Sequence, residues 1–201
     1  MGTKIIISAV FLFCLFLGFA QINKDKTNPI LFAEMFVGYS GGSSEGWTGG
    51  FTVNYQFKDN LITGRSLGLS HLRYEGLFLV IPIYKQIEAI DEYAIMYGKR
   101  HVYKGHSFSY SAGLATVDRA YLIENDGDSY YRNEYHLGIP FELNIKWFNN
   151  ERERYRVYYL IPVGKPIAFS RSFGFKLMGN ISKTTFIGLG ISYGLGWHKT
   201  Y

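Results

Sequence analysis

Charged and amide side chains at every second position are the chemically distinctive feature of this sequence. Glu142, Asn144 and Lys146 alternate with apolar residues over 135–147. Such groups on one face of a strand can pair with one another or carry out acid–base chemistry. Because a buried charge is costly unless it is paired, we expect a structural ion-pair network, with a polar conduit or a carboxylate base as the alternative. The residues expected in this interior network are Glu34, Asn54, Gln56, Glu142, Asn144, Lys146, Lys176 and Asn180.

Two serines could in principle act as nucleophiles. Ser192 lies in a G-x-S-x-G pattern, but it stands inside an alternating strand with no helix after it, and a nucleophile elbow needs a strand-to-helix turn. Ser129 and His136 are the best candidates for a lipid-modifying site, but nothing in their spacing shows that base and nucleophile meet. We therefore expect no catalytic residues.

Metal and thiol chemistry also find little support. Asp126 and Asp128 are weak metal candidates, because Asn125–Asp128 lacks the ligand spacing and distal Glu of a calcium loop and is typical of a turn. The five histidines show no metal-binding spacing. Cys14 is the only cysteine and lies in the expected leader, so a mature chain could form no disulfide. No metal and no cofactor are expected.

The elements that position these side chains are read best from residues 184–197. There Leu189, Ile191 and Tyr193 share one strand face, while the other face carries only glycines and Ser192. An apolar outer face and a small or polar inner face are typical of a transmembrane β-barrel strand. Seven further segments are interpreted as strands: 32–40, 49–58, 61–74, 92–100, 107–118, 135–147 and 168–181.

The expected fold is all-β: an eight-stranded antiparallel up-and-down transmembrane β-barrel. Residues 155–163 also resemble a strand, so ten strands stay open as an alternative. The face of 61–74 is ambiguous, because Leu67 and Leu69 share it with Arg65. Residues 41–48, 75–90, 119–134 and 182–184 are expected as external connections, and residues 58–60, 101–105 and 148–167 as inner ones.

The apolar run Gly76–Ile83 falls in an expected external loop. Apolar side chains there could cover the barrel mouth, extend the strands or contact an apolar ligand. We expect an apolar mouth formed by Leu77, Phe78, Leu79, Val80 and Ile83.

The N-terminus predicts export. Lys4 precedes an apolar run that is too short for a membrane helix and ends near Ala20, which is typical of a cleaved signal peptide. The expected organisation is a signal peptide at 1–20, a periplasmic lead at 21–31 and an outer-membrane barrel at 32–201. Aromatic residues make up 18% of the chain, as aromatic girdles require, and the net charge of +5 forms no nucleic-acid-binding stripe.

Four segments carry a resemblance to a known class of proteins: EYAIMYGKR (92–100), KGHSFSYSAGL (104–114), GIPFELNIKWF (138–148) and GNISKTTFIGLGISYGLGW (179–197). In these the chain resembles the small outer-membrane β-barrel proteins of Bacteroidetes type. The resemblance implies a fold and a location, and it lends no catalytic residues. The inserted segment 149–166 departs from that pattern.

The function expected from these features is that of a non-catalytic integral outer-membrane barrel with a structural or surface-interaction role. A barrel that handles a small apolar ligand or lipid through its external mouth is the alternative, and a lipid-modifying enzyme is the third reading. Expected partners are outer-membrane lipids and lipopolysaccharide, and the barrel-assembly machinery through the C-terminal strand. No nucleic acid is expected, and the chain is expected to be a monomer.

Overall fold

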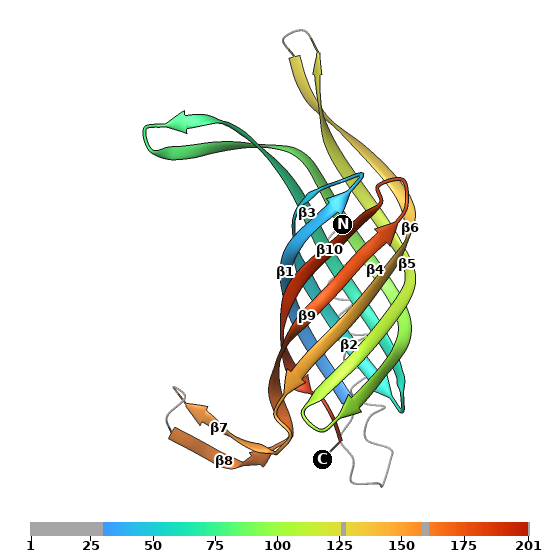
Figure 1. Cartoon of the computed structure of the whole chain (residues 1–201), viewed down its shortest axis with the longest axis vertical. Helices are drawn as coiled ribbons and strands as arrows, with labels where there is room; N and C mark the ends of the chain where they lie inside the picture. The colour runs from blue at the N-terminus through green and yellow to red at the C-terminus, as the bar shows by residue number, and fades with distance from the viewer. Residues whose placement is uncertain (1–29, 126–127, 158–160, 201) are drawn as a thin grey trace, which may run out of the picture.

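Eight antiparallel strands close into a barrel, as the sequence predicts (Figure 1). The computed structural model describes residues 30–125, 128–157 and 161–200. Around the barrel the order is β1-β10-β9-β6-β5-β4-β3-β2, and pairing of β1 with both β2 and β10 closes the ring. The barrel strands are β1 (Ile30–Gly42), β2 (Gly46–Phe57), β3 (Asn60–Phe78), β4 (Ile81–Tyr103), β5 (His106–Asn125), β6 (Asp128–Phe148), β9 (Phe169–Ile181) and β10 (Phe186–Trp197).

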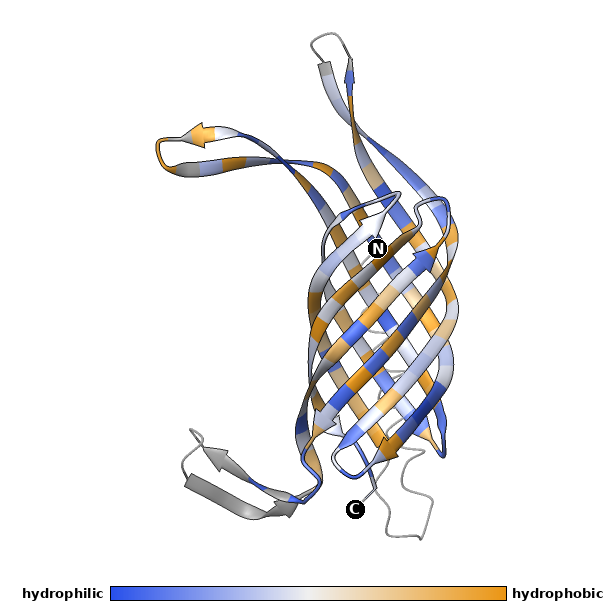
Figure 2. Cartoon of the chain, in the orientation of Figure 1, coloured by the Kyte–Doolittle hydropathy of each residue, from blue (hydrophilic) through white to orange (hydrophobic). Residues whose placement is uncertain are grey.

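Alternation along each strand separates an apolar outer surface from the interior. Met35, Leu189 and Ile95 are 72%, 68% and 74% exposed on the outside, whereas Glu34 and Glu142 are 2% and 0% exposed. Figure 2 shows the resulting exchange of hydrophobic and hydrophilic positions along the barrel strands. A closed sheet leaves no unpaired edge, so this surface can face lipid without exposing backbone polar groups. Within the described residues, no helix is long and apolar enough to span a membrane.

Four strands continue well beyond the barrel wall. Strands β3, β4, β5 and β6 have 19, 23, 20 and 21 residues, against 12 or 13 in β1, β2, β9 and β10. The β3–β4 and β5–β6 extensions form two hairpins at one end of the barrel, and β3–β4 bends away from the barrel axis (Figure 1). The expectation of loops at 75–90 and 119–134 was therefore wrong for most of both segments. Strand pairing satisfies the backbone groups there without needing lipid on either face.

The inserted segment forms a separate two-stranded sheet at the opposite end. Strand β7 (Glu153–Val157) pairs with β8 (Ile161–Ile167) and with no described barrel strand. Of the segment 155–163, the described residues 155–157 and 161–163 lie in strands as expected, but the barrel itself keeps eight strands. The ten-stranded barrel is excluded.

The ambiguous face of β3 is resolved by burial. Arg65, Leu67 and Leu69 are 3%, 1% and 2% exposed and all point into the barrel. The pairing of β3 with β4 shifts register between His71 and Leu72 and again between Tyr74 and Gly76, beyond the leucines. The bulges therefore leave the leucines inward and instead accompany the bend of the hairpin.

The N-terminal boundaries lie largely outside the described residues. The expected signal peptide at 1–20 and most of the lead at 21–31 belong to the segment before Ile30. Strand β1 begins at Ile30, two residues earlier than expected from the alternation.

Candidate functional site in the barrel interior

An ion-pair network crosses the middle of the barrel interior. Lys176 on β9 lies 3.2 Å from Glu142 on β6 and 3.5 Å from Glu34 on β1, measured from Nζ to the carboxylate oxygens. Lys146 forms an ion pair with Glu34 as well. All four side chains are 2% exposed or less. These ion pairs therefore link strands β1, β6 and β9, of which β1 is far from the other two in the sequence.

Arg65 and Glu92 complete this network, and neither was included in the sequence-derived set. Arg65 donates two hydrogen bonds to Glu92, at 2.9 and 2.7 Å, and its Nη1 lies 3.6 Å from Glu142. The alternation of Tyr93, Ile95 and Tyr97, all exposed, contains the signal that Glu92 points inward. Arg65 lacked such a signal because it shares its face with leucines.

The interior amides bridge the charged groups. Asn144 donates to Glu142 at 2.9 Å, and Asn180 donates to Glu92 at 2.5 Å. Asn54 accepts a hydrogen bond of 2.8 Å from Thr63. The eight residues expected in the interior are all buried, although Gln56 lies apart from the ion pairs, near the β2–β3 turn, where it donates to the carbonyl of Lys58.

Above the ion pairs, towards the two hairpins, the interior is apolar. Leu69 pairs with Ile90 across β3 and β4, which places this layer near the end from which the hairpins extend. With the ion pairs beneath it, the layer fills the cross-section of a barrel that is only wide enough for side chains. Its members are Phe36, Leu67, Leu69, Ile90, Val117, Met178 and Phe186.

The opposite end of the interior holds a caged arginine. The Arg100 guanidinium is fully buried, with its Cζ 4.8 Å from the Phe32 ring centroid and 5.5 Å from that of Phe148. It donates to Gln56 Oε1 and to the His198 carbonyl, both at 2.8 Å. The sequence shows that Arg100 shares a face with Glu92, but it gives no indication of the aromatic cage.

The catalytic candidates do not form a site. Ser192 faces the interior of β10, where its register partners are Phe36 and Gly174, within a continuous strand. Ser129 and His136 lie seven residues apart on β6, a separation of about 23 Å along a strand, and an odd spacing places them on opposite faces. His136 instead contacts Thr184, with 2.9 Å between Nε2 and Oγ1.

The apolar residues expected at the mouth lie elsewhere. Leu77, Leu79, Val80 and Ile83 are 63%, 86%, 88% and 45% exposed at the tip of the β3–β4 hairpin, which turns away from the barrel end (Figure 1). Leu77 and Ile83 lie in the extended strands, and Leu79 and Val80 form the turn between them. Pairing of β3 with β4 therefore carries all four away from the opening. The side chain of Phe78 lies outside the described set.

The weak metal candidates can be followed only in part. Asp126 lies outside the described residues, and only the backbone of Asp128 is described. In the part of the chain that the structure describes, no three His, Cys, Asp or Glu side chains are grouped so as to hold a metal ion.

A second ion cluster ties the two hairpins together where they separate. Glu124 on β5 accepts hydrogen bonds from Arg73 at 2.8 Å and from Lys85 at 2.9 Å. The hydrogen bond from Lys85 lowers the pKa of the Glu124 carboxyl below its usual value, and the bond from Arg73 adds to the effect. The same contact raises the pKa of Lys85. Tyr131 on β6 also donates to the Gln86 carbonyl, at 2.7 Å.

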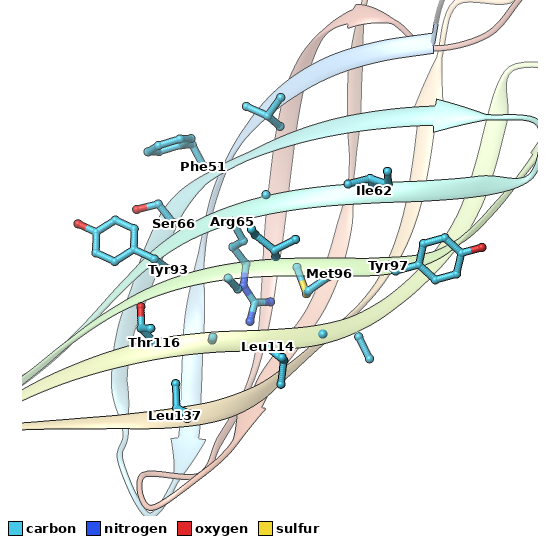
Figure 3. Close-up of a pocket in the computed structure, with 17 residues that line it drawn as sticks. Phe51, Ile62, Arg65, Ser66, Tyr93, Met96, Tyr97, Leu114, Thr116 and Leu137 are labelled. Carbon is cyan, nitrogen blue, oxygen red and sulfur yellow. The ribbon is translucent and has the colours of Figure 1, made fainter. Parts of the chain in front are cut away.

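The outer wall carries one large hollow over β2 to β6. Its volume is about 1070 Å³, and Figure 3 shows Phe51, Tyr93 and Leu114 around it. Gly64 and Ala112 line it and lack large side chains, which leaves space for the hollow. A Cβ at Gly64 would meet no atom within 4 Å.

Comparisons with known proteins place the fold. No protein-family model matches the sequence, and neither does any curated protein. Among solved structures, Neisserial surface protein A matches with a TM-score of 0.50 at 8% identity, over 83% of this chain and 95% of that one. The N-terminal barrel of Pseudomonas aeruginosa OprF matches at 0.44, with 11% identity and coverage of 83% and 99%. Ail of Yersinia pestis, solved with the heparin analogue sucrose octasulfate, matches at 0.43, with 10% identity and coverage of 85% and 97%.

These likenesses concern architecture. The resemblance to barrels of Bacteroidetes type stays a prediction, because these structural matches carry no information on origin. The ring of eight antiparallel strands and its apolar outer band give this chain the fold of an eight-stranded outer-membrane transmembrane β-barrel.

Proposed function

We propose that this protein is an integral outer-membrane barrel without catalytic activity, whose closed barrel presents two hairpins as surface-interaction elements. The observation that carries this proposal is the filled interior. Glu34, Glu92 and Glu142 face Arg65, Lys146 and Lys176, three charges of each sign, and the apolar layer lies above them. A balanced, hydrogen-bonded network accounts for these charges without a substrate.

The hairpins support the surface role. Strand β1 begins and β10 ends at the barrel end opposite the hairpins, so a chain with both termini in the periplasm would present the hairpins outside the cell (Figure 1). About ten residues suffice for a tilted strand to cross the membrane. Strand β4 has 23 residues and pairs with β5 from Glu88 onward, so residues 81–87 lie beyond the barrel wall and its remaining length is more than a crossing needs.

Planar-bilayer recording tests the closed interior. The refolded protein is expected to give no steady single-channel conductance, because the ion pairs and the apolar layer occupy the lumen. A stable ohmic conductance would contradict the structural role and favour a conduit. Lipid A mass spectra from cells with and without the protein test the lipid-modifying alternative, and are expected to be the same.

Cysteine labelling tests the orientation. The only natural cysteine, Cys14, lies in the expected leader, so a single introduced cysteine in the mature chain would be the sole label site. Val80→Cys on the hairpin tip should react with a membrane-impermeant maleimide on intact cells, whereas Lys104→Cys in the opposite turn should react only after lysis. The reverse pattern would overturn the assignment.

The ligand-handling alternative has one observation in its favour. Leu79 and Val80 are 86% and 88% exposed, and apolar area left in water costs about 25 cal/mol per Å². The tip nevertheless turns away from the barrel, and the apolar layer closes the interior behind the mouth. These residues therefore fit contact with an external partner better than delivery of a ligand into the barrel.

A further inference from the structure

Arg100 is a buried cation whose charge is not matched by a carboxylate. The central network pairs Glu34, Glu92 and Glu142 with three cations. Glu88, nearer the hairpins, pairs with Arg119. Within the described residues, no carboxylate lies in ion-pair range of Arg100.

The guanidinium is held by neutral groups alone. Its Nε donates to the Ser107 hydroxyl at 3.2 Å, and its Nη1 donates to Gln56 and to the His198 carbonyl. Its Nη2 is buried and has no hydrogen-bond partner. Two N–H groups and a whole positive charge are therefore left without a counterpart in a place shielded from bulk water, which is costly.

Buried polar atoms without hydrogen-bond partners also lie near Arg100, at the same end of the barrel. The hydroxyl of Ser170 is buried without a partner, and Ser170 pairs in register with Gly196, two residues before His198. The His198 ring packs against Phe32 and Phe148, at 4.9 and 5.4 Å between ring centroids. These are the same two rings that cage Arg100.

A second cation reinforces the positive character of this end. Lys146 Nζ lies 4.9 Å from the centroid of the Phe32 ring, on which Arg100 also packs. The carboxylate that Lys146 contacts, Glu34, is shared with Lys176. Glu34 is therefore already paired with two other cations and does not balance the charge of Arg100.

We propose that this end of the barrel interior binds a small inorganic anion, such as chloride, at Arg100 Nη2. A small ion suits the place, because the Phe32 and Phe148 ring centroids lie only 4.8 and 5.5 Å from Arg100 Cζ. A hydroxyl such as that of Ser170 can donate to an anion alongside the guanidinium. The anion would balance the fourth buried cation and satisfy its free N–H groups.

Halide dependence of stability tests the proposal on the unmodified protein. An anion that binds only the folded barrel lowers the unfolding equilibrium constant by the factor 1 + [anion]/Kd, or about 11-fold at ten times Kd. The folded barrel should therefore unfold at higher urea concentration in potassium chloride than in potassium gluconate of equal ionic strength. Equal midpoints in the two salts would overturn the proposal.

Variants locate the effect. Arg100→Gln should lose the chloride dependence, whereas Lys99→Gln, which removes an exposed cation from the same strand, should keep it. A crystal grown in bromide should show an anomalous peak beside Arg100 in the parent, and an empty position there would contradict the site.

Discussion

Lys176 Nζ lies 3.2 Å from Glu142 Oε2 inside the barrel, although 34 residues separate them in the sequence. Lys176 pairs in register with Asn144 rather than with Glu142, so the contact is diagonal across β6 and β9. Both side chains are fully buried. The barrel therefore carries an ion pair that joins the strands on either side of the β7–β8 insertion.

Removing one partner of this pair should lower the free energy of unfolding more than removing both. Glu142→Gln or Lys176→Met alone leaves an uncompensated buried charge, and such losses typically cost about 3–5 kcal/mol. The double variant keeps Glu34 and Glu92 opposite Lys146 and Arg65, so the charges stay balanced. Urea unfolding in lipid vesicles measures the coupling in a double-mutant cycle.

The exposed pair of Glu134 and Lys183 is the matched control. Lys183 Nζ lies 3.6 Å from Glu134 Oε2, but the Lys183 side chain is 72% exposed. Surface pairs are worth about 0–1 kcal/mol, so the same cycle there should be nearly additive. Simple additivity at Glu142 and Lys176 would argue against a coupled interior.

A charged side chain on the outer face of β10 should impair folding far more than a substitution on its inner face. Ile191→Arg places a guanidinium toward lipid near mid-strand, at an expected cost of about 2–4 kcal/mol. Ser192→Ala, at the neighbouring inward position, should change folding little. Folding yields in vesicles compare the two, and equal yields would contradict the assigned faces.

Much of this face assignment follows from the sequence, and the exceptions have physical causes. Leu137 to Trp147 alternate cleanly because one face meets lipid and the other the polar interior. Leu67 and Leu69 break the rule, since part of the interior is apolar. Residues 75–90 were misinterpreted because a hairpin with water on both faces needs no alternation.

Glycine shows a further limit of sequence reasoning. The sequence assigns Gly190 to the inner face, where alternation alone sets no limit on the size of a side chain. A Cβ at Gly190 would instead lie 2.6 Å from the Val37 carbonyl oxygen, so a larger residue requires the backbone to move. Close approach of neighbouring strands depends on three-dimensional register, which alternation alone does not contain.

The hollow of the outer wall gives a prediction about Gly64, and Gly98, which does not line it, is the comparison. Gly64→Ala should leave the free energy of unfolding nearly unchanged, because a Cβ there meets no atom within 4 Å. Gly98→Ala should destabilise the barrel, because its Cβ would overlap the Tyr110 carbonyl oxygen. The urea midpoints of the two variants test this difference. Equal losses of stability would show that a Cβ at Gly64 has no more space than one at Gly98.

The hairpin junction should depend on pH. The lowered pKa of Glu124 means that its contacts stabilise the junction above the ordinary Glu pKa and are lost as pH falls through the lowered value. The raised pKa of Lys85 means that its contribution is present below the ordinary Lys pKa and is lost as pH rises through the raised value. The two hairpins should therefore be held together at neutral pH and separate in acid, whereas strong base should remove only the Lys85 contact, because Arg73 keeps its charge.

Spin labels on the two hairpins, at Val80→Cys and Ser129→Cys, measure this separation. The distance distribution should be narrow at pH 7 and broaden in acid, and Glu124→Gln should broaden it at pH 7. Lys183→Gln, which removes a cation outside the junction, should leave it narrow. A distribution unchanged by Glu124→Gln would show that Tyr131 and the backbone alone hold the junction.

Leu79 combines an unfavourable backbone with an exposed apolar side chain. Its φ is 58°, in the left-handed region that costs a residue such as leucine about 1–2 kcal/mol, and it is 86% exposed. Asparagine tolerates this conformation and turns readily. Leu79→Asn should therefore preserve or stabilise the hairpin turn, and it should leave the temperature at which the folded barrel unfolds unchanged, because the tip makes no contact with the barrel wall (Figure 1).

The same substitution should weaken apolar contacts made by the tip. Cells that display Leu79→Asn together with Val80→Ser should adhere less to a hydrocarbon phase than cells that display the parent at equal surface density. Glu75→Gln is the control, because it changes the hairpin without removing apolar area. If adhesion is unaltered while barrel stability falls, the tip packs against the barrel as a lid and the surface-interaction role loses its main support; if adhesion falls alone, these exposed side chains remain available to an external apolar partner.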